Sequence, residues 1–144
     1  MGLITYDTSA LIAYQPARFP AGYRFSAVVI QEMTAGATGK SELKFWEATM
    51  RGYAKAGHLL VPTDEDWFLA GKVLYALLQR LKIEAGGQTP RLHPDDKQRI
   101  IRDVLIARTA KRAGALLVTD NVKDFARIKR FCTVRTISGA AYFG

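Results

Sequence analysis

Apolar and polar positions along this chain form two kinds of pattern, one typical of strands and one typical of helices. Segments with the two patterns alternate along the chain. Short, nearly continuous apolar runs bounded by turn residues are typical of buried strands. Such runs predict strands near residues 3–6, 23–26, 58–61, 115–118 and 133–137. Longer stretches in which apolar residues recur every three or four positions are typical of amphipathic helices. These predict helices near residues 8–14, 28–35, 41–56, 63–84, 94–113 and 120–129.

Strands that alternate with helices favour an α/β fold, a three-layer α/β/α sandwich with a mainly parallel central sheet. The chain has 144 residues, so we expect one domain over residues 1–144. Segments rich in proline and glycine at 16–22 and 86–94 are expected to be loops. Ser41 and Thr63 are each expected to cap the helix that follows, and Gly114 to end the helix that begins at Pro94.

Composition narrows the class of protein. Apolar residues make up 49% of the chain, enough for a core, yet no apolar run is long enough to cross a bilayer. The N-terminal residues do not resemble a signal peptide, so we expect a cytoplasmic protein without a membrane partner. A single cysteine, Cys132, excludes an internal disulfide framework. The two histidines, His58 and His93, lie far apart, which makes a zinc site improbable.

The net charge of +8 is unevenly distributed. Residues 1–96 contain ten groups of each sign, whereas residues 97–144 contain eleven basic residues against three acidic ones. A basic region of this kind favours a polyanion such as nucleic acid, through contacts to phosphates. A basic surface without any partner is the alternative.

Two aspartates directly follow predicted strands: Asp7 after residues 3–6, and Asp120 after Thr119 and residues 115–118. Ligands of open parallel sheets bind at the carboxyl ends of the strands, so both side chains are expected at one edge. A role as a helix cap is the ordinary alternative for each. Two aspartates at equivalent strand ends favour a shared site.

Two further acids lie in predicted helices among apolar residues. Asp103 lies beside Ile100 and Val104, and Glu32 follows Ile30. A carboxylate on a packed face is costly unless it is paired or bound to a metal. The alternatives are that Asp103 pairs with Arg99 or Lys111 or faces solvent, and that Glu32 is an ordinary exposed helix residue.

Together these acids suggest a carboxylate cluster without a histidine or cysteine nucleophile. Such a cluster repels itself, so the pKa of at least one carboxyl should be raised in the absence of metal. Hard oxygen ligands favour Mg²⁺ or Mn²⁺ over zinc. Beside a basic surface, a metal cluster of this kind suits hydrolysis of phosphodiester bonds.

At this point the chain resembles the PIN-domain nucleases, in particular the VapC-type toxins of toxin–antitoxin pairs. Residues 6–12 (Tyr-Asp-Thr-Ser-Ala-Leu-Ile) resemble the opening motif of that family, and residues 31–36 (Gln-Glu-Met-Thr-Ala-Gly) its glutamate segment. Residues 102–107 with Ala110 resemble its aspartate helix, and residues 117–125 its closing strand-to-helix turn. Each motif alone is weak, but all of them in this order form a strong signal.

The resemblance implies a Mg²⁺-dependent (or Mn²⁺-dependent) endoribonuclease that a small VapB-like antitoxin inhibits, and that often forms a homodimer. Carried over by position, the metal-binding and catalytic acids are Asp7, Glu32 and Asp103. Asp120 is favoured as the fourth, and Asp124 or Asn121 is its substitute. Ser9, and less directly Thr8, is expected to hydrogen-bond an acid or a metal-bound water, with helix capping as the alternative.

Other side chains extend this interpretation. The candidate contacts to RNA phosphates are Arg102, Arg108, Lys123 and Arg127. A stacking platform for bases, or a groove for an antitoxin helix, is the less favoured interpretation of a set of aromatic residues whose helical spacing favours core packing: Trp46, Trp67, Phe68 and Tyr75. The two helices within residues 41–94 are expected to pack against a partner.

Two other functions fit parts of the pattern. A non-catalytic RNA-binding domain would use the acids structurally and would bind RNA without cutting it. A phosphotransfer domain would use Asp7 as nucleophile, but this chemistry usually needs a second aspartate two residues later, where this chain has Ser9. The nuclease hypothesis is therefore the one that we carry forward.

Overall fold

The computed structural model describes residues 2–14, 23–88 and 92–144. Within these residues five parallel strands form one sheet in the order β3-β2-β1-β4-β5. The strands are β1 (Leu3–Tyr6), β2 (Tyr23–Ser26), β3 (Leu59–Leu60), β4 (Ala115–Val118) and β5 (Thr136–Ile137). The helices are α1 (Thr8–Tyr14), α2 (Ala27–Ala35), α3 (Lys40–Lys55), α4 (Asp64–Glu84), α5 (Pro94–Ala113), α6 (Val122–Ile128) and α7 (Gly139–Phe143).

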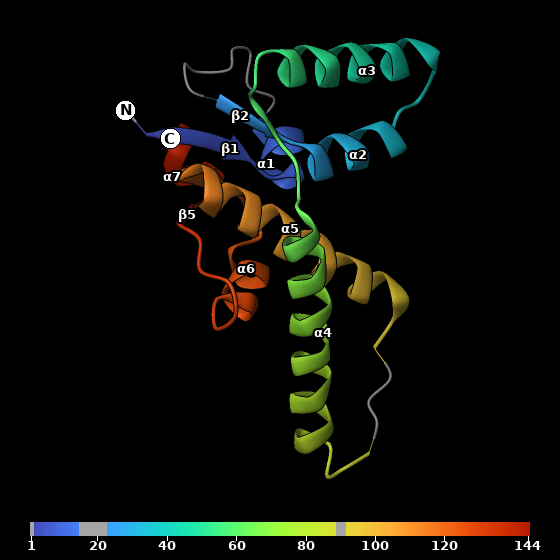
Figure 1. The fold of residues 1–144 in the computed structure, drawn as a ribbon, viewed down its shortest axis with the longest axis vertical. Helices are drawn as coiled ribbons and strands as arrows, with labels where there is room; N and C mark the ends of the chain where they lie inside the picture. The colour runs from blue at the N-terminus through green and yellow to red at the C-terminus, as the bar shows by residue number, and fades with distance from the viewer. Residues whose placement is uncertain (1, 15–22, 89–91) are drawn as a thin grey trace.

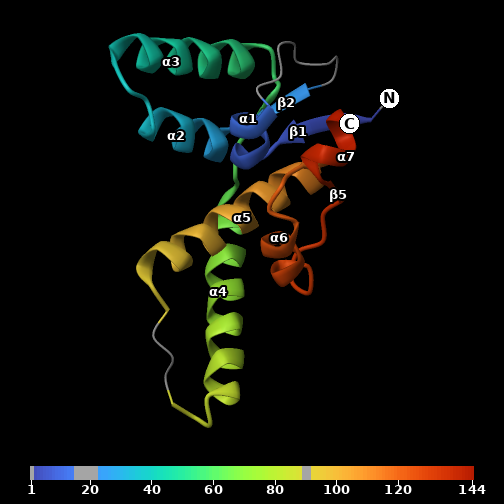
Figure 2. The ribbon, with the colours of Figure 1, turned by 180° about the vertical axis from the view of Figure 1, so that it is seen from behind.

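Helices lie on both sides of the sheet, so the predicted three-layer α/β architecture is confirmed. Figures 1 and 2 show α3 on one side of β1 and β2 and α5 on the other, while α4 extends away from the sheet. The central strands β1 and β4 are enclosed, and the side chains of Tyr6, Leu117 and Val118 are buried. The described helices include none that is long and apolar enough to cross a membrane.

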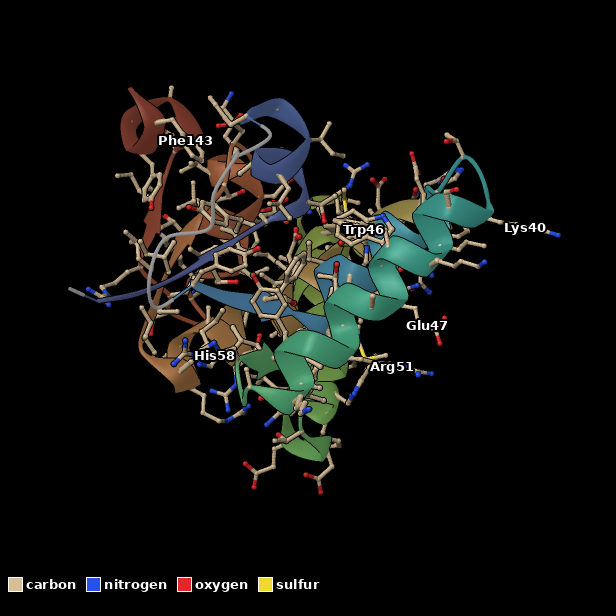
Figure 3. The ribbon with its side chains drawn as sticks, turned by 90° about the horizontal axis from the view of Figure 1, so that it is seen from above. Lys40, Trp46, Glu47, Arg51, His58 and Phe143 are labelled. Carbon is tan, nitrogen blue, oxygen red and sulfur yellow. The ribbon has the colours of Figure 1, made fainter. Side chains whose placement is uncertain are left out.

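Aromatic side chains join α3 to the sheet. Phe25 of β2 packs edge-on against Tyr53 and Trp46, with ring centroids 5.3 and 6.1 Å apart. In Figure 3, α3 lies across β2 with Trp46 on its inner side, whereas Glu47 and Arg51 project outward. Phe25 and Tyr23, which alternate along β2, therefore hold α3 against the sheet.

Helix boundaries follow local chemistry. Thr63 and Asp66 form a capping box, in which the Thr63 hydroxyl accepts from the Asp66 N–H and the Asp66 carboxylate accepts from the Thr63 N–H. Gly114 ends α5 in the left-handed conformation, with φ of 68°. Both ends agree with the sequence prediction. The cap expected at Ser41 is wrong, because α3 begins one residue earlier, after Gly39.

The end of the chain differs from prediction in three places. Helix α6 is shorter than the predicted 120–129, and β5 has two residues where 133–137 was predicted. Helix α7 was not predicted, because five residues are too few to display a helical period. It packs Phe143 against Tyr6, with stacked rings 5.8 Å apart. The predicted loop at 16–22 lies outside the described residues, and so do residues 89–91 of the predicted loop at 86–94.

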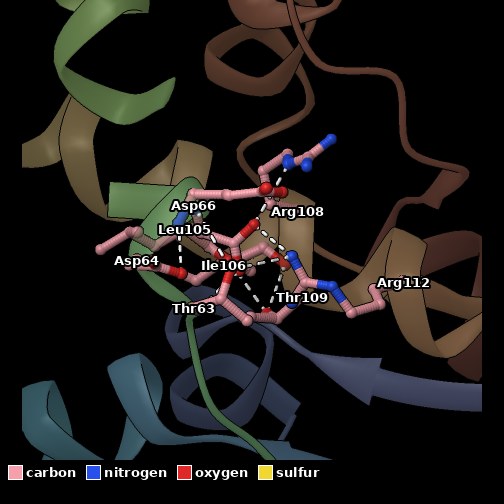
Figure 4. A network of polar contacts seen from close by, with 9 residues as sticks. Thr63, Asp64, Asp66, Leu105, Ile106, Arg108, Thr109 and Arg112 are labelled. Atoms are coloured by element: carbon pink, nitrogen blue, oxygen red, sulfur yellow. Dashed lines mark hydrogen bonds and ion pairs between the residues drawn. The ribbon is translucent and has the colours of Figure 1, made fainter. Parts of the chain in front are cut away.

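Asp66 anchors α4 to α5 and is completely buried. Its carboxylate accepts hydrogen bonds from Arg112, from Arg108 at 3.2 Å and from the Thr63 N–H at 2.9 Å, as Figure 4 shows. Burial alone would raise the pKa of Asp66, but these donors outweigh it and lower the pKa to about 2. The charged form of Asp66 is therefore the one that stabilises the fold.

Replacement of Asp66 by Asn should lower the free energy of unfolding near neutral pH by about 2–4 kcal/mol, because two arginines lose a buried carboxylate. The charge contributes above the ordinary pKa of 3.8 and is lost as the pH falls toward about 2. Urea denaturation at several pH values should therefore show the difference from wild type narrowing in acid. Asp64→Asn, at an exposed residue of the same helical turn, is the matched control, and an equal loss in both variants would contradict this role.

Candidate functional site

Asp7 follows β1 at the carboxyl edge of the sheet and is held rigidly. Its N–H donates to the Val118 carbonyl at 2.9 Å, which extends the pairing of β1 with β4 by one residue. Its carboxylate accepts from the Thr8 N–H at 2.8 Å, from the Ser9 hydroxyl at 3.1 Å and from the Thr119 hydroxyl at 2.8 Å. Burial raises the pKa of Asp7 although these donors oppose the shift, and the nearby Asp124 raises it further.

Asp103, on α5, is 7% exposed and sits among buried apolar residues. Within the described residues its Oδ2 atom has no hydrogen-bond partner. Burial raises the pKa of Asp103 to about 8, helped by the negative charges of Asp7, Asp124 and Glu32, while Arg127 opposes the shift. The expectation that repulsion raises the pKa of at least one carboxyl is confirmed.

Neither of the basic residues expected to neutralise Asp103 does so. Arg99 pairs with Asp96 at 3.8 Å, and the Lys111 ammonium donates to the Thr133 hydroxyl. A buried carboxylate oxygen without a donor costs free energy whenever it is charged. This position is therefore the strongest indication of a binding site in the described part of the chain.

Glu32, on α2, completes the group from the opposite side. Its side chain is 25% exposed, and its Oε1 atom lies 3.7 Å from Nε of Arg102, the residue before Asp103. Burial raises the pKa of Glu32, Arg102 opposes the shift, Asp7 adds to it, and the Thr8 hydroxyl lowers it. The interpretation of Glu32 as a freely exposed helix residue is therefore wrong.

The fourth acid is where sequence and structure differ. Asp120, which we favoured, is exposed, and its Oδ1 atom accepts from the Tyr14 hydroxyl at 3.3 Å and from the Gly139 N–H at 3.0 Å. It is not among the charges that shift the pKa of Asp7, Glu32 or Asp103. Asp124, in the first turn of α6, interacts with both Asp7 and Asp103. Of the two, Asp124 is therefore the one whose charge acts on Asp7 and Asp103.

The polar neighbours have mainly orienting roles. Ser9 donates to Asp7, and its hydroxyl accepts from the Asp120 N–H at 3.2 Å, so it links the two strand ends. Thr119, which the sequence analysis did not single out, makes the shortest side-chain hydrogen bond to Asp7. Asn121 precedes α6 and is exposed, and its N–H donates to the Thr119 hydroxyl at 3.0 Å. The signal that could have identified Thr119 is its position directly after β4, the strand that pairs with β1 before Asp7.

The four basic candidates differ in their surroundings. Arg102 and Arg127 interact with the acidic group, through Glu32 and Asp103 respectively. Lys123 is exposed at the start of α6. Arg108 pairs with Asp66 on the α4 side of α5 and is structural, so the phosphate contact expected of it is not supported.

One hollow borders the acidic group at Glu32, and a second is linked to it through Arg102. The first, of about 520 Å³, is lined by Thr8 and Glu32 and by the apolar side chains of Ile12, Phe45 and Trp46. The other, of about 460 Å³, is lined by residues of α2 and α5, including Arg102, and by Trp67 of α4. Core packing is confirmed for Trp46, which is half-buried. It is wrong for the exposed aromatic residues Trp67, Phe68 and Tyr75.

The donor set is made of carboxylate and hydroxyl oxygens, which suit Mg²⁺ or Mn²⁺. Within residues 2–14, 23–88 and 92–144 no three acidic, histidine or cysteine side chains are already arranged to hold one metal ion. Magnesium usually keeps several waters and takes only one or two protein carboxylates, so a closed cage of protein ligands is not needed. Asp7 and Asp103 are the residues best placed to supply them.

Comparison with solved structures identifies the fold. A chain of VapBC-1 from nontypeable Haemophilus influenzae matches with a TM-score of 0.53 and 20% identity, over 96% of this chain and 98% of that one. A chain of DNA-bound VapBC from Salmonella typhimurium matches with a TM-score of 0.54 and 19% identity, over 96% and 99%. The fold is that of VapC-type PIN domains.

A third structure agrees. A chain of VapBC2 from Rickettsia felis, bound to a promoter DNA fragment, matches with a TM-score of 0.51 and 17% identity, over 94% of this chain and 98% of that one. No protein-family model and no curated protein matches the sequence. At these identities the likeness shows the PIN fold, and the chemistry must be argued from the residues.

Replacement of Asp103 by Asn should stabilise the metal-free protein at alkaline pH. In the wild type the unfolded carboxyl ionises at 3.8 and the folded one at about 8, so the free energy of unfolding falls as the pH rises between these values. The amide cannot ionise, so the variant should gain a few kcal/mol, roughly, above about pH 8 and little near pH 4. Thermal unfolding in chelator at both extremes measures this. Asp120→Asn, at an exposed site, should differ from wild type by the same small amount at alkaline pH and near pH 4. A loss of stability in Asp103→Asn at alkaline pH would contradict the prediction.

Proposed function

We propose that this chain is a metal-dependent endoribonuclease that hydrolyses RNA phosphodiester bonds at the group formed by Asp7, Glu32, Asp103 and Asp124. The observation that supports this most directly is the unpartnered, buried Oδ2 atom of Asp103 beside three other carboxylates. A buried carboxylate oxygen without a donor, close to other negative charges, is stable in its ionised form only when a cation joins it.

Asp7 and Asp103 would hold Mg²⁺ or Mn²⁺, with Glu32 and Asp124 beside them. Such a cation supplies a water of lowered pKa and positive charge for the phosphate oxygens. The Thr8 N–H and the hydroxyls of Ser9 and Thr119 fix the carboxylate of Asp7, so this ligand does not need to reorganise. Arg102 holds Glu32 in place through the ion pair at 3.7 Å.

The basic side chains around the group would bind the substrate. Arg127 and Lys123 of α6, together with Arg102 of α5, are partly or fully exposed and lie on the elements that carry Asp124 and Asp103. Contacts from arginine and lysine to phosphates position a nucleic acid without reading its sequence. The basic excess of residues 97–144 would add affinity that depends on salt.

We further place the chain in a type II toxin–antitoxin pair, as the toxin. The three solved structures compared above are VapBC structures, and two of them are described as bound to DNA. The apolar hollow of about 520 Å³ beside Glu32 exposes Ile12 and Phe45 next to the acids. A segment of a small VapB-like antitoxin that filled this hollow would cover the site. A homodimer of the chain belongs to the same proposal.

Substitution of the acids tests the proposal. With structured RNA and Mg²⁺ or Mn²⁺, Asp7→Asn and Asp103→Asn should each reduce the cleavage rate by on the order of 100-fold or more, and chelator should abolish cleavage. Asp124→Asn should lose activity, whereas Asp120→Asn, its exposed neighbour, should remain within about threefold of wild type. Wild-type turnover by Asp7→Asn or Asp103→Asn would refute the assignment.

A second measurement does not depend on turnover. Added Mg²⁺ or Mn²⁺ should raise the melting temperature of the wild type at alkaline pH and leave that of Asp103→Asn nearly unchanged. Only the wild type has the charged Asp103 carboxylate that the cation would bind. Equal shifts in both proteins would place the cation elsewhere. RNA binding without any product, at every metal concentration, would favour the non-catalytic RNA-binding domain.

A further inference from the structure

The hollow of about 460 Å³ lies between α2, α5 and the start of α4 and shares no lining residue with the proposed antitoxin groove. Its floor is apolar and comes from Val28 of α2 and from Ile101 and Leu105 of α5. Its rim is formed by Val61, after β3, and by Trp67 in the first turns of α4. Both rim residues are largely exposed, at 57% and 56%. An apolar cavity with an exposed indole on its rim is ready to receive a flat, apolar surface.

The polar groups of this hollow are few and come from amides. Gln31 of α2 and Gln98 of α5 both line it and are exposed, and each amide has donors and an acceptor. An aromatic ring on one side and amide groups at the edge match a nucleobase, which has a stacking face and hydrogen-bonding edges. A purely apolar helix face would leave these amides unpaired, which disfavours a protein segment.

Arg102 links the hollow to the acidic group. Arg102 lines the hollow and at the same time pairs with Glu32 at 3.7 Å. Gln31 is the residue before Glu32, and Arg102 is the residue before Asp103. The same arginine side chain thus borders the hollow and contacts one of the carboxylates. A nucleotide with its phosphate at the acids and its neighbouring base in the hollow would have the Arg102 guanidinium beside its backbone.

We propose that this hollow binds one unstacked base of the RNA, next to the phosphate that is cut, with Trp67 as the stacking surface and Gln31 and Gln98 at the base edge. This inference rests on the proposed function for the identity of the substrate. It assigns to the hollow the selection of a nucleotide beside the cut and predicts that single-stranded loops are preferred over duplex. A base inside an A-form helix cannot leave the stack without loss of pairing.

Tryptophan fluorescence tests stacking directly, because the chain contains only two tryptophans. In Asp7→Asn protein with chelator, the second substitution Trp46→Phe leaves Trp67 as the only indole. Short single-stranded RNA should quench its emission with saturation, because a stacked base contacts the ring. With Trp67→Phe instead, the same RNA should change the emission little. An abasic ribose-phosphate oligomer of equal length should bind weakly and quench neither protein.

Affinity and cleavage pattern give the second test. Trp67→Ala should weaken the binding of single-stranded RNA by roughly 5- to 50-fold. Gln98→Ala should change which nucleotide is preferred beside the cut. The matched controls are Phe68→Ala and Tyr75→Ala, which remove neighbouring exposed aromatic residues that do not line this hollow, and both should bind and cut as wild type does. Circular dichroism of each variant confirms that it is folded.

The outcomes separate this inference from the proposed function. If Asp7→Asn abolishes cleavage while Trp67→Ala leaves both affinity and cleavage pattern unchanged, the base pocket is refuted and the nuclease stands. If Asp7→Asn still cleaves but RNA quenches Trp67, the pocket stands and the acids do not act as proposed. RNA that binds, by anisotropy, without quenching Trp67 overturns the pocket. The pocket is also overturned if Trp67→Ala changes the oligomeric state and RNA does not quench Trp67 in the Trp46→Phe protein. That result would make the hollow a protein interface.

Discussion

At the centre of the sheet, β1 pairs in parallel with β4 along its whole length, and Asp7 continues this pairing through its bond to the Val118 carbonyl. This register places Thr119 beside Asp7, so that a hydroxyl from one strand end fixes a carboxylate from the other. Helices α2 and α5 pack against each other, which brings Glu32 and Asp103 toward Asp7. Without the β1–β4 register, the acids would be spread along the chain. The whole acidic site depends on this one alignment of backbone.

Two buried aspartates of this fold show how environment decides the state of the same side chain. Asp66 and Asp103 are both almost completely buried, on α4 and α5 respectively. Two arginines and the Thr63 N–H donate to Asp66, so its pKa falls to about 2. Asp103 is buried facing other carboxylates, so its pKa rises to about 8. The first is a structural charge that holds two helices together. The second is a group that the fold alone does not satisfy, which is the usual mark of a position used for binding.

Most elements of the fold could be predicted, because apolar runs, caps and glycines act locally: Thr63 begins α4 and Gly114 ends α5 as expected. The positions of Asp7, Glu32 and Asp103 in one group also follow from strand ends and helix faces. What could not be predicted depends on contacts between distant segments. Arg108 lies 42 residues from its partner Asp66, and helical spacing alone does not tell whether anything covers Trp67. The choice between Asp120 and Asp124 depends on where α6 begins, and a turn of two residues determines that.

The strand order has a consequence for how the protein is made. β1 is synthesised first, but its neighbour β4 follows more than a hundred residues later, and Tyr6 receives its cover from Tyr142 and Phe143 later still. Figures 1 and 2 show the last helix, α7, beside β1. Contacts of such long sequence separation form slowly, and until they form the apolar strand is exposed. On the ribosome, therefore, β1 waits without its central partner, and the acidic group assembles only after β4 and α6 have been synthesised.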